Sequence, residues 1–324
     1  MIIVKAPTRI DLAGGTLDIW PLSVLFAPSA SINAAIDLHA SIEARQTKWR
    51  GVAIKNANTG KIVKYSPKTA ENRKSLFDRA LDFAPVNGWE FSATSSVPPG
   101  SGLGGSSSML IAFLRILDEI RGRGTSDGDI LEAAKNIEAR HLGIPTGVQD
   151  YVAALNGGVN ALIHAKEGSE YRRLKVDPKE LKSRVVLAYS GVSRVSGAPN
   201  WQMLKKAVEK DVKTVRAFEK IAANSLDILL ALANGRYSRV GRLIDVESAQ
   251  RGLLGRGVIT PRLKTAFAVA VRNGGHPKVC GAGGGGCFIV WCEPSRKDLI
   301  ISALRESGLR TLDFKVAPAA GRPA

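Results

Sequence analysis

The chain has 324 residues and a mass of 34.5 kDa, enough for one large domain or two medium domains that each bury a core. Its 44% hydrophobic and 23% charged residues are ordinary for a soluble globular protein, whereas its net charge of +17 favours an anionic partner. The 46 Lys and Arg residues form no block or tail, so a mixed solvated surface accounts for them equally well. Because the chain starts with a strand-like segment and has no apolar run near the roughly 18 residues of a membrane span, we expect a cytoplasmic protein.

The cysteines and histidines give no pattern of metal ligands. Cys280, Cys287 and Cys292 are the only cysteines, and their spacing matches no zinc motif. The four histidines are isolated from one another. We therefore expect the cysteines to be small apolar residues in a reducing compartment.

The first third of the chain is predicted to consist mainly of strands. Alternating apolar and polar residues predict strands at 2–5, 9–13, 31–47, 51–55, 61–65 and 90–96, with a turn over 6–8. A Gly-Gly pair at 14–15 is expected to bend the chain and to present Asp18. Apolar residues at helical spacing predict one helix over 73–84.

The segment 97–110, VPPGSGLGGSSSML, lies between a predicted strand and a predicted buried helix. Gly100, Gly102 and Gly104 allow positive φ and close approach to a ligand, and the helix that begins near Gly105 or Ser106 offers unpaired N–H groups. This combination indicates a phosphate cradle. It is not a Walker A loop, because none of residues 98–108 is basic. The alternative is a flexible connector, but linkers rarely run straight from a strand into a strongly apolar helix.

The remainder of the chain is predicted to be mainly helical. Helices are expected at 105–121, 127–141, 151–155, 200–235, 236–250, 261–272 and 295–306. Strands are expected at 159–164, 185–188 and 310–316, and 278–292 is expected to form a strand, a glycine turn and a second strand. The segment GIPTGVQD (143–150) interrupts the helical region, and the charged stretch 166–184 resembles a linker or an edge between two halves.

Three separated motifs carry a resemblance to a known family. PTRIDLAGGTLD (7–18), PPGSGLGGSSS (98–108) and CGAGGGGC (280–287) resemble, in order and separation, the signature motifs of the GHMP kinases, the superfamily of galactokinase, homoserine kinase, mevalonate kinase and phosphomevalonate kinase. RIDLAGG, GVQD and KVCGAGGGGC look most like sugar kinases of the heptose 7-phosphate kinase and fucokinase type. Arg9 leans the same way, since mevalonate kinases usually carry Lys there.

The resemblance implies a fold of two α/β domains. The first, over residues 1–170, is expected to be similar to ribosomal protein S5 domain 2 and to carry the ATP-binding Gly/Ser loop. The second, over residues 171–324, is expected to be ferredoxin-like, with the active cleft between the two. ATP and Mg²⁺ are the cofactors that the resemblance implies.

The resemblance also assigns roles to particular residues. Asp150 matches the catalytic base and Arg9 a cation beside the transferred group. From the residues alone, Asp150 is equally well interpreted as a helix N-cap, and the less favoured alternative for Arg9 is a surface arginine on a strand. Ser106 and Glu138 match a magnesium site, although the serine role falls on either Ser106 or Ser107. The nucleotide-binding residues implied are Pro99, Gly100, Ser101, Gly102, Leu103, Gly104, Gly105, Ser106 and Ser107. The acceptor-binding residues implied are Asp18, Gly15, Thr16, Gly283 and Gly284.

Three functional hypotheses follow. The first is an ATP- and Mg²⁺-dependent kinase that phosphorylates a hydroxyl of a sugar or sugar phosphate, and the second replaces that acceptor with mevalonate or a related isoprenoid alcohol. The third is a non-catalytic basic protein that binds RNA, disfavoured by the 6% of aromatic residues and by the absence of a basic stripe. We expect a small-molecule partner and neither nucleic acid nor a membrane, and we leave a homodimer open.

Overall fold

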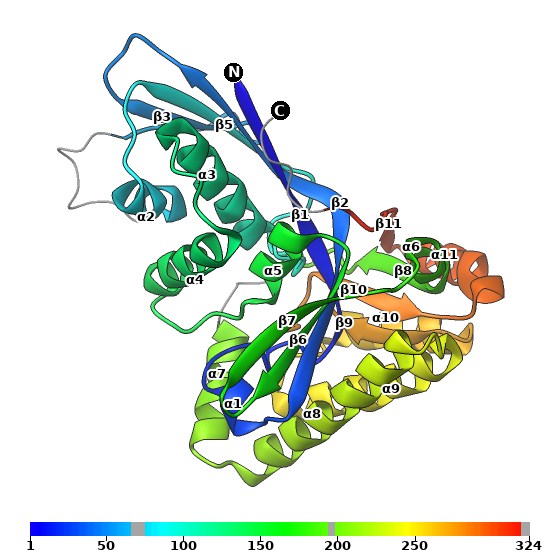
Figure 1. Ribbon diagram of the computed structural model, residues 1–324. Helices are drawn as coiled ribbons and strands as arrows, with labels where there is room; N and C mark the ends of the chain where they lie inside the picture. Colours follow the sequence, from blue (N-terminus) through cyan, green and yellow to red (C-terminus); the bar gives the residue numbers. More distant parts are fainter. Residues whose placement is uncertain (66–74, 194–197, 319–324) are drawn as a thin grey trace.

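Two sheets organise the protein, one in each half of the chain (Figure 1). The computed structural model describes residues 1–65, 75–193 and 198–318. Within them the two-domain α/β architecture expected from the motifs is confirmed. None of the helices in this described part is both long and apolar enough to pass through a bilayer.

The first sheet is built around β2, an 18-residue strand. The strand order is β4-β3-β5-β2-β6-β7, with β1 paired to β2 off this path. One edge of β2 pairs with β1 along most of its length, while β6 pairs with its beginning and β5 with its end. The strands are β1 (Ile2–Ala13), β2 (Ser29–Gln46), β3 (Val52–Asn56), β4 (Ile62–Tyr65), β5 (Trp89–Ser95), β6 (Val159–Ala165) and β7 (Gly168–Leu174).

Helices pack on one face of this sheet and enclose the first core (Figure 1). The α3 helix lies against β1 and β2, because most of its sides are apolar. It ends at Gly122, which takes the left-handed conformation. Phe113 of α3 makes edge-on contacts with Phe77 and Phe91, with ring centroids 4.8 and 5.0 Å apart. The helices of this half are α1 (Leu22–Leu25), α2 (Leu76–Phe83), α3 (Gly105–Arg121), α4 (Asp127–Leu142) and α5 (Gln149–Asn156).

The second sheet is antiparallel, with the strand order β11-β8-β10-β9. Its strands are β8 (Val185–Tyr189), β9 (His276–Val279), β10 (Cys287–Trp291) and β11 (Arg310–Leu312). Alternate residues of β10 enter different cores: Phe288 and Val290 face α10 and α11, whereas Ile289 and Trp291 face α8, α9 and β1. The βαββαβ pattern of strands and helices is the expected ferredoxin-like one.

Helices surround this sheet and also touch the first one. Contacts of α8 with β2 and of α9 with β1 join the two halves. The helices are α6 (Pro178–Arg184), α7 (Ala198–Val208), α8 (Val212–Ala233), α9 (Tyr237–Leu254), α10 (Pro261–Arg272) and α11 (Lys297–Glu306), with a 3₁₀ turn at Pro294–Arg296.

Several predicted elements differ from the structure. The predicted turn over 6–8 is a shift of register within the continuous strand β1, between Pro7 and Thr8. The expected linker 166–184 contains β7 and α6, and the expected domain boundary after residue 170 falls within β7, which pairs with β6. The single helix predicted over 200–235 is divided into α7 and α8, because Lys210 takes a positive φ of 60° and Asp211 caps the second helix. The first residues of the helix predicted over 73–84 lie outside the described residues, and α2 begins at Leu76.

Candidate active site

A cavity of about 680 Å³ lies where the Gly/Ser loop, β1 and the segment before α5 meet. The turn after β9 contributes Gly281 and Ala282 to its wall, and α7 contributes Asn200, so both halves of the chain line it. The residues that line it near β3 and α2 are Asn56, Asn58, Thr59, Ser75, Leu76 and Phe77. Thr16 and Asn200 line it near α1 and α7, elements that lie far from β3 and α2 in Figure 1.

The Gly/Ser loop has the geometry expected of an anion cradle. Gly100, Gly102 and Gly104 have φ values of 68°, 77° and 77°, as the sequence predicts. Gly104 is the N-cap of α3, and among the described residues no side chain caps it. The first helical hydrogen bond runs from Ser108 N to Gly104 O, so the N–H groups of residues 105–107 are the ones that a helix offers to a phosphate.

Arg9 and Asp150 form an ion pair beside this helix start. Both Nε and Nη2 of Arg9 lie 2.6 Å from Asp150 Oδ1, and Nη1 donates to Gly102 O at 2.5 Å. Burial opposes the charge on Arg9, but the carboxylates of Asp150 and Asp11 outweigh it, so the pKa of Arg9 is raised. A Cβ on Gly104 would lie only 2.9 Å from Asp150 Cγ, so the carboxylate packs directly on the loop backbone.

Glu138 of α4 also lies beside the start of α3. Its Oε2 accepts a hydrogen bond from Ser107 Oγ at 2.8 Å and another from the Tyr151 hydroxyl. Burial raises the pKa of Glu138, while hydrogen bonds from Tyr151, Ser107 and Ser106 act in the opposite direction. Ser106 is exposed and Ser107 is buried, and both line the cavity.

Asp18 lies at the end of the cavity that Thr16 and Asn200 line, beside the GVQD segment that carries Asp150. It accepts hydrogen bonds from Gln149 N at 2.9 Å and Gln149 Nε2 at 3.3 Å, and Gly147 allows its close approach. Burial raises the pKa of Asp18 to about 6. Thr16 also lines this end, has an unusual φ of 78°, and donates to Asn200 Oδ1 at 3.3 Å.

The glycine turn after β9 contacts the Gly/Ser loop directly. Cys287 N donates to Ser101 O at 2.6 Å, and a Cβ on Gly286 would lie 2.5 Å from the same oxygen. Ser101 and Cys287 are 186 residues apart in the chain, and the fold brings their backbones into contact. Only glycine at position 286 allows these two segments of backbone to approach so closely.

Most of the residues singled out from the sequence lie around this one cavity, and four do not. Those in its wall are Arg9, Thr16, Asp18, Pro99, Gly100, Ser101, Gly102, Gly104, Gly105, Ser106, Ser107, Glu138 and Asp150. Leu103 is instead fully buried in the core, and Gly15 packs against Asp11. Gly283 and Gly284 pack against the backbone of Val258, so the turn presents Gly281 and Ala282 to the cavity in their place.

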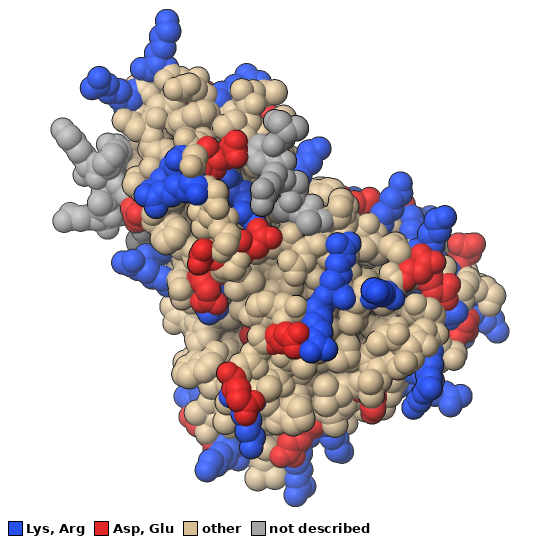
Figure 2. Space-filling model, viewed as in Figure 1, with Lys and Arg blue, Asp and Glu red and all other residues tan. Residues whose placement is uncertain are grey.

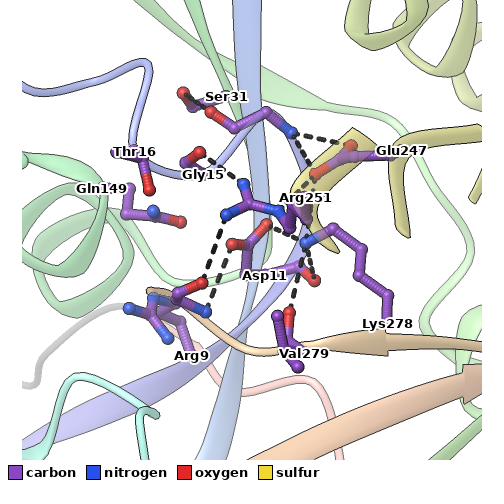
Figure 3. A network of polar contacts seen from close by, with 12 residues as sticks. Arg9, Asp11, Gly15, Thr16, Ser31, Gln149, Glu247, Arg251, Lys278 and Val279 are labelled. Carbon is purple, nitrogen blue, oxygen red and sulfur yellow. Dashed lines mark hydrogen bonds and ion pairs between the residues drawn. The ribbon is translucent and has the colours of Figure 1, made fainter. Parts of the chain in front are cut away.

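Four charged residues behind this wall form a cluster that the sequence did not indicate, and which we call the buried charge cluster: Asp11, Glu247, Arg251 and Lys278 (Figure 3). Lys278 Nζ lies 2.7 Å from Asp11 Oδ1 and 3.4 Å from Glu247 Oε1. Burial alone would raise the pKa of Asp11, but Lys278 and Arg251 outweigh it and lower that pKa.

Only part of this cluster left any signal in the sequence. Asp11 and Lys278 lie inside or next to the quoted motifs, where a charged residue within an apolar strand is itself unusual. Glu247 and Arg251 are four residues apart on α9, a spacing that is typical of an exposed helix pair. Nothing local distinguishes them from a surface pair, because their burial depends on β1 and β9.

Comparisons with known proteins agree with this geometry. Residues 68–158 match the family model of the GHMP kinases N terminal domain, and residues 228–309 match that of the GHMP kinases C terminal domain. The chain is 26% identical to a D-glycero-alpha-D-manno-heptose 7-phosphate kinase of Campylobacter jejuni, over 97% of this chain and 96% of the relative. It is 25% identical to a mevalonate kinase of Thermococcus onnurineus, over 98% of this chain and 96% of the relative.

A solved structure is similar over the same length. The D-glycero-D-manno-heptose 1-phosphate kinase from Bacteroides thetaiotaomicron has a TM-score of 0.77 and 25% identity, covering 99% of this chain and 98% of that one. The chain therefore belongs to the GHMP kinase superfamily, and it is a kinase of that family. The relatives' printed names include both heptose phosphate and mevalonate kinases, so the family defines the class of enzyme but not the acceptor.

Proposed function

We propose that this protein transfers the γ-phosphoryl group of ATP to a hydroxyl of a sugar or sugar phosphate, with a heptose 7-phosphate as the nearest model of the acceptor. The observation that carries this proposal is the Arg9–Asp150 ion pair packed against the start of α3, in one cavity with the Gly/Ser loop. A phosphate cradle, a cation and a carboxylate therefore line one cavity. Phosphoryl transfer needs these groups to position the phosphates, to stabilise the developing charge and to accept the proton of the hydroxyl.

In this proposal the N–H groups at the start of α3 hold the ATP phosphates, and Asp150 faces the acceptor hydroxyl. The bond from the acceptor oxygen to the γ-phosphorus forms, the bond from that phosphorus to the ADP oxygen breaks, and Asp150 takes the hydroxyl proton. Arg9 stabilises the charge that develops on the transferred group while it keeps Asp150 oriented. Both side chains come from regular elements, β1 and α5, which keeps their separation fixed.

The residues beside the helix start suit a magnesium ion. A carboxylate and hydroxyl oxygens are hard ligands of the kind that Mg²⁺ takes when phosphate oxygens supply the remainder, and Ser107 already donates a hydrogen bond to Glu138 there. Among the described residues no group of three or more His, Cys, Asp or Glu side chains is placed to hold a metal, so phosphate oxygens would have to complete this site. Glu138 with Ser106 or Ser107 would hold the ion, which would neutralise charge on the phosphates.

Asp18 and Thr16 are the proposed contacts of the acceptor. Their end of the cavity also contains Gln149 and Asn200, so it offers polar side chains that match a molecule with several hydroxyls. Mevalonate has fewer hydroxyls than a sugar, so it would leave more of these polar side chains without a hydrogen-bond partner. These features favour a sugar over an isoprenoid alcohol.

The face seen in Figure 2 gives little support to an RNA-binding role. Figure 2 shows Lys and Arg side chains scattered over the visible face and interspersed with Asp and Glu. Protein–RNA interfaces are expected to combine a basic stripe with exposed aromatic platforms. The positive net charge is therefore better explained as a general attraction for phosphorylated small molecules.

The test is a panel of acceptors with detection of ADP release. D-glycero-D-manno-heptose 7-phosphate, galactose and mevalonate are each offered to the purified protein with ATP and Mg²⁺. Turnover with a sugar at least about tenfold above that with mevalonate, in kcat/KM, would support the proposal. Preference for mevalonate would favour the second hypothesis, and salt-dependent RNA binding without ATP turnover would favour the third.

A further inference from the structure

Two turns border the acceptor end of the cavity, and both are held from behind by the buried charge cluster. The first turn is residues 14–16, which leads from β1 to Asp18, and the second is Gly281–Ala282 after β9. Glu247 and Arg251 have no exposed side-chain surface and do not line the cavity within the described residues. They therefore cannot touch an acceptor themselves, and any effect they have on it passes through these turns.

The contacts from α9 to the first turn are specific and involve backbone groups. Gly14 N donates to both carboxylate oxygens of Glu247, at 3.1 and 3.0 Å. The carbonyl of the next residue, Gly15, accepts a hydrogen bond from Nη2 of Arg251. The α9 helix thus binds the N–H of Gly14 and the C=O of Gly15, so the peptide groups of the turn are held on both sides. Figure 3 shows Glu247 and Arg251 beside Gly15.

The same cluster holds the second turn. Arg251 Nη1 donates to Gly281 O at 3.3 Å, and Gly281 N donates to Asp11 Oδ2 at the same distance. Arg251 therefore bridges the carbonyls of Gly15 and Gly281, one in each turn. Its planar guanidinium suits this double contact, which the single ammonium of a lysine would not reproduce.

We propose that Glu247 and Arg251 are positioning residues for the acceptor site: they fix the 14–16 turn against Gly281, and so hold Thr16 and Asp18 where an acceptor is bound. This inference rests on the proposed function for the role of Thr16 and Asp18, but the fixing of the turn does not depend on it. The unusual positive φ of Thr16, the residue after the two fixed groups, is consistent with a turn held by its surroundings.

Because the charges of the cluster balance in pairs, the proposed positioning role can be tested apart from a general loss of stability. Removing one member leaves an uncompensated buried charge, which destabilises a fold strongly. Removing Glu247 and Arg251 together leaves Asp11 paired with Lys278, and apolar replacements of a buried pair are often neutral for stability. A double variant therefore loses the contacts to the turn while the cluster stays electrically balanced.

The experiment compares wild type with the double variant E247L/R251M. Ile244→Ala is the control, since Ile244 is fully buried on the same helix and its apolar side chain makes no hydrogen bond to the turn, so its truncation loosens packing alone. For each protein we measure the melting temperature, the Kd of ADP, the KM of D-glycero-D-manno-heptose 7-phosphate, and amide hydrogen exchange of peptides covering residues 14–18 and 98–107.

In the double variant we expect exchange at 14–18 to accelerate by at least about tenfold, the size expected when one or two buried hydrogen bonds are lost. Acceptor KM should rise by a similar factor, while the Kd of ADP and exchange at 98–107 stay within about twofold of wild type. Ile244→Ala should lower the melting temperature at least as much as the double variant and leave acceptor KM unchanged.

Unchanged exchange at 14–18 in a folded double variant overturns the inference, as does an equal rise of acceptor KM in Ile244→Ala. If wild type phosphorylates none of the three panel acceptors, the proposed function fails, and exchange at the turn alone then decides whether α9 holds it. Should the double variant not fold, R251K is measured in the same way. It keeps the charge but not the double contact, so unchanged exchange in that variant would equally refute the inference.

Discussion

Replacing Gly104 with Ala tests whether Asp150 must stay where the loop backbone holds it. Gly104 has a φ of 77° and precedes α3, and a Cβ there would lie 2.9 Å from Asp150 Cγ. Gly122, at the other end of α3, supplies the control: it has a φ of 60°, and a Cβ there would meet nothing within 4 Å. Both substitutions force an L residue into the left-handed region, but only Gly104→Ala also pushes on the carboxylate.

The expected magnitudes follow from this geometry. Holding alanine in the left-handed region costs roughly 1–2 kcal/mol at either position. The new Cβ would lie 2.9 Å from Asp150 Cγ, and lengthening this distance to an ordinary contact of about 3.4 Å moves Asp150 by about 0.5 Å. This movement disturbs the 2.6 Å contacts between Asp150 and Arg9. Since a misplacement of about 1 Å can cost about 10²-fold in rate, we expect kcat to fall about tenfold in Gly104→Ala.

The assay is steady-state turnover with the best acceptor of the panel, together with unfolding in urea for both variants. Gly122→Ala should lose stability and keep its kcat, which separates the backbone cost from the displacement of Asp150. If kcat of Gly104→Ala stays within about twofold of that of Gly122→Ala, then the position of Asp150 does not limit the reaction and the argument from close packing is refuted.

Three further predictions concern the same cavity. Asp150→Asn removes the proposed proton acceptor and keeps its shape, so kcat should fall about 10²-fold or more while the Kd of ADP is nearly unchanged, and wild-type turnover would exclude Asp150 from the chemistry. Ser106→Ala and Ser107→Ala are compared by titrating the rate with Mg²⁺; the variant that needs several-fold more Mg²⁺ identifies the hydroxyl that acts with Glu138, and two unshifted midpoints contradict a hydroxyl ligand. Because burial raises the pKa of Asp18 to about 6, its carboxylate is ionised above that pH, so acceptor kcat/KM should decline as the pH falls below about 6. Asp18→Asn should abolish this decline, and a decline that persists in the variant belongs to another group.

The local features of the site were accessible from the sequence because they depend on neighbouring residues. Gly100, Gly102 and Gly104 are adjacent to an apolar helix, so their positive φ values and the exposed helix start follow from composition and order alone. The capping of α4 by Ser126, whose side chain accepts a hydrogen bond from Asp129 N, likewise depends on only a few neighbouring residues. The break at Lys210 was missed because no glycine or proline marks it.

The sequence by itself determined the Gly/Ser loop with its positive-φ glycines, the order of the three motifs and the membership of the chain in a kinase family, since each is a matter of short-range chemistry or of linear order. Only the tertiary structure decided that Asp150 packs on Gly104, that Cys287 reaches the Gly/Ser loop, and that Glu247 and Arg251 are buried. The physical reason is that burial and charge pairing depend on elements that are distant in the chain. An acid and an arginine four residues apart on a helix read as a solvated pair until another strand covers them.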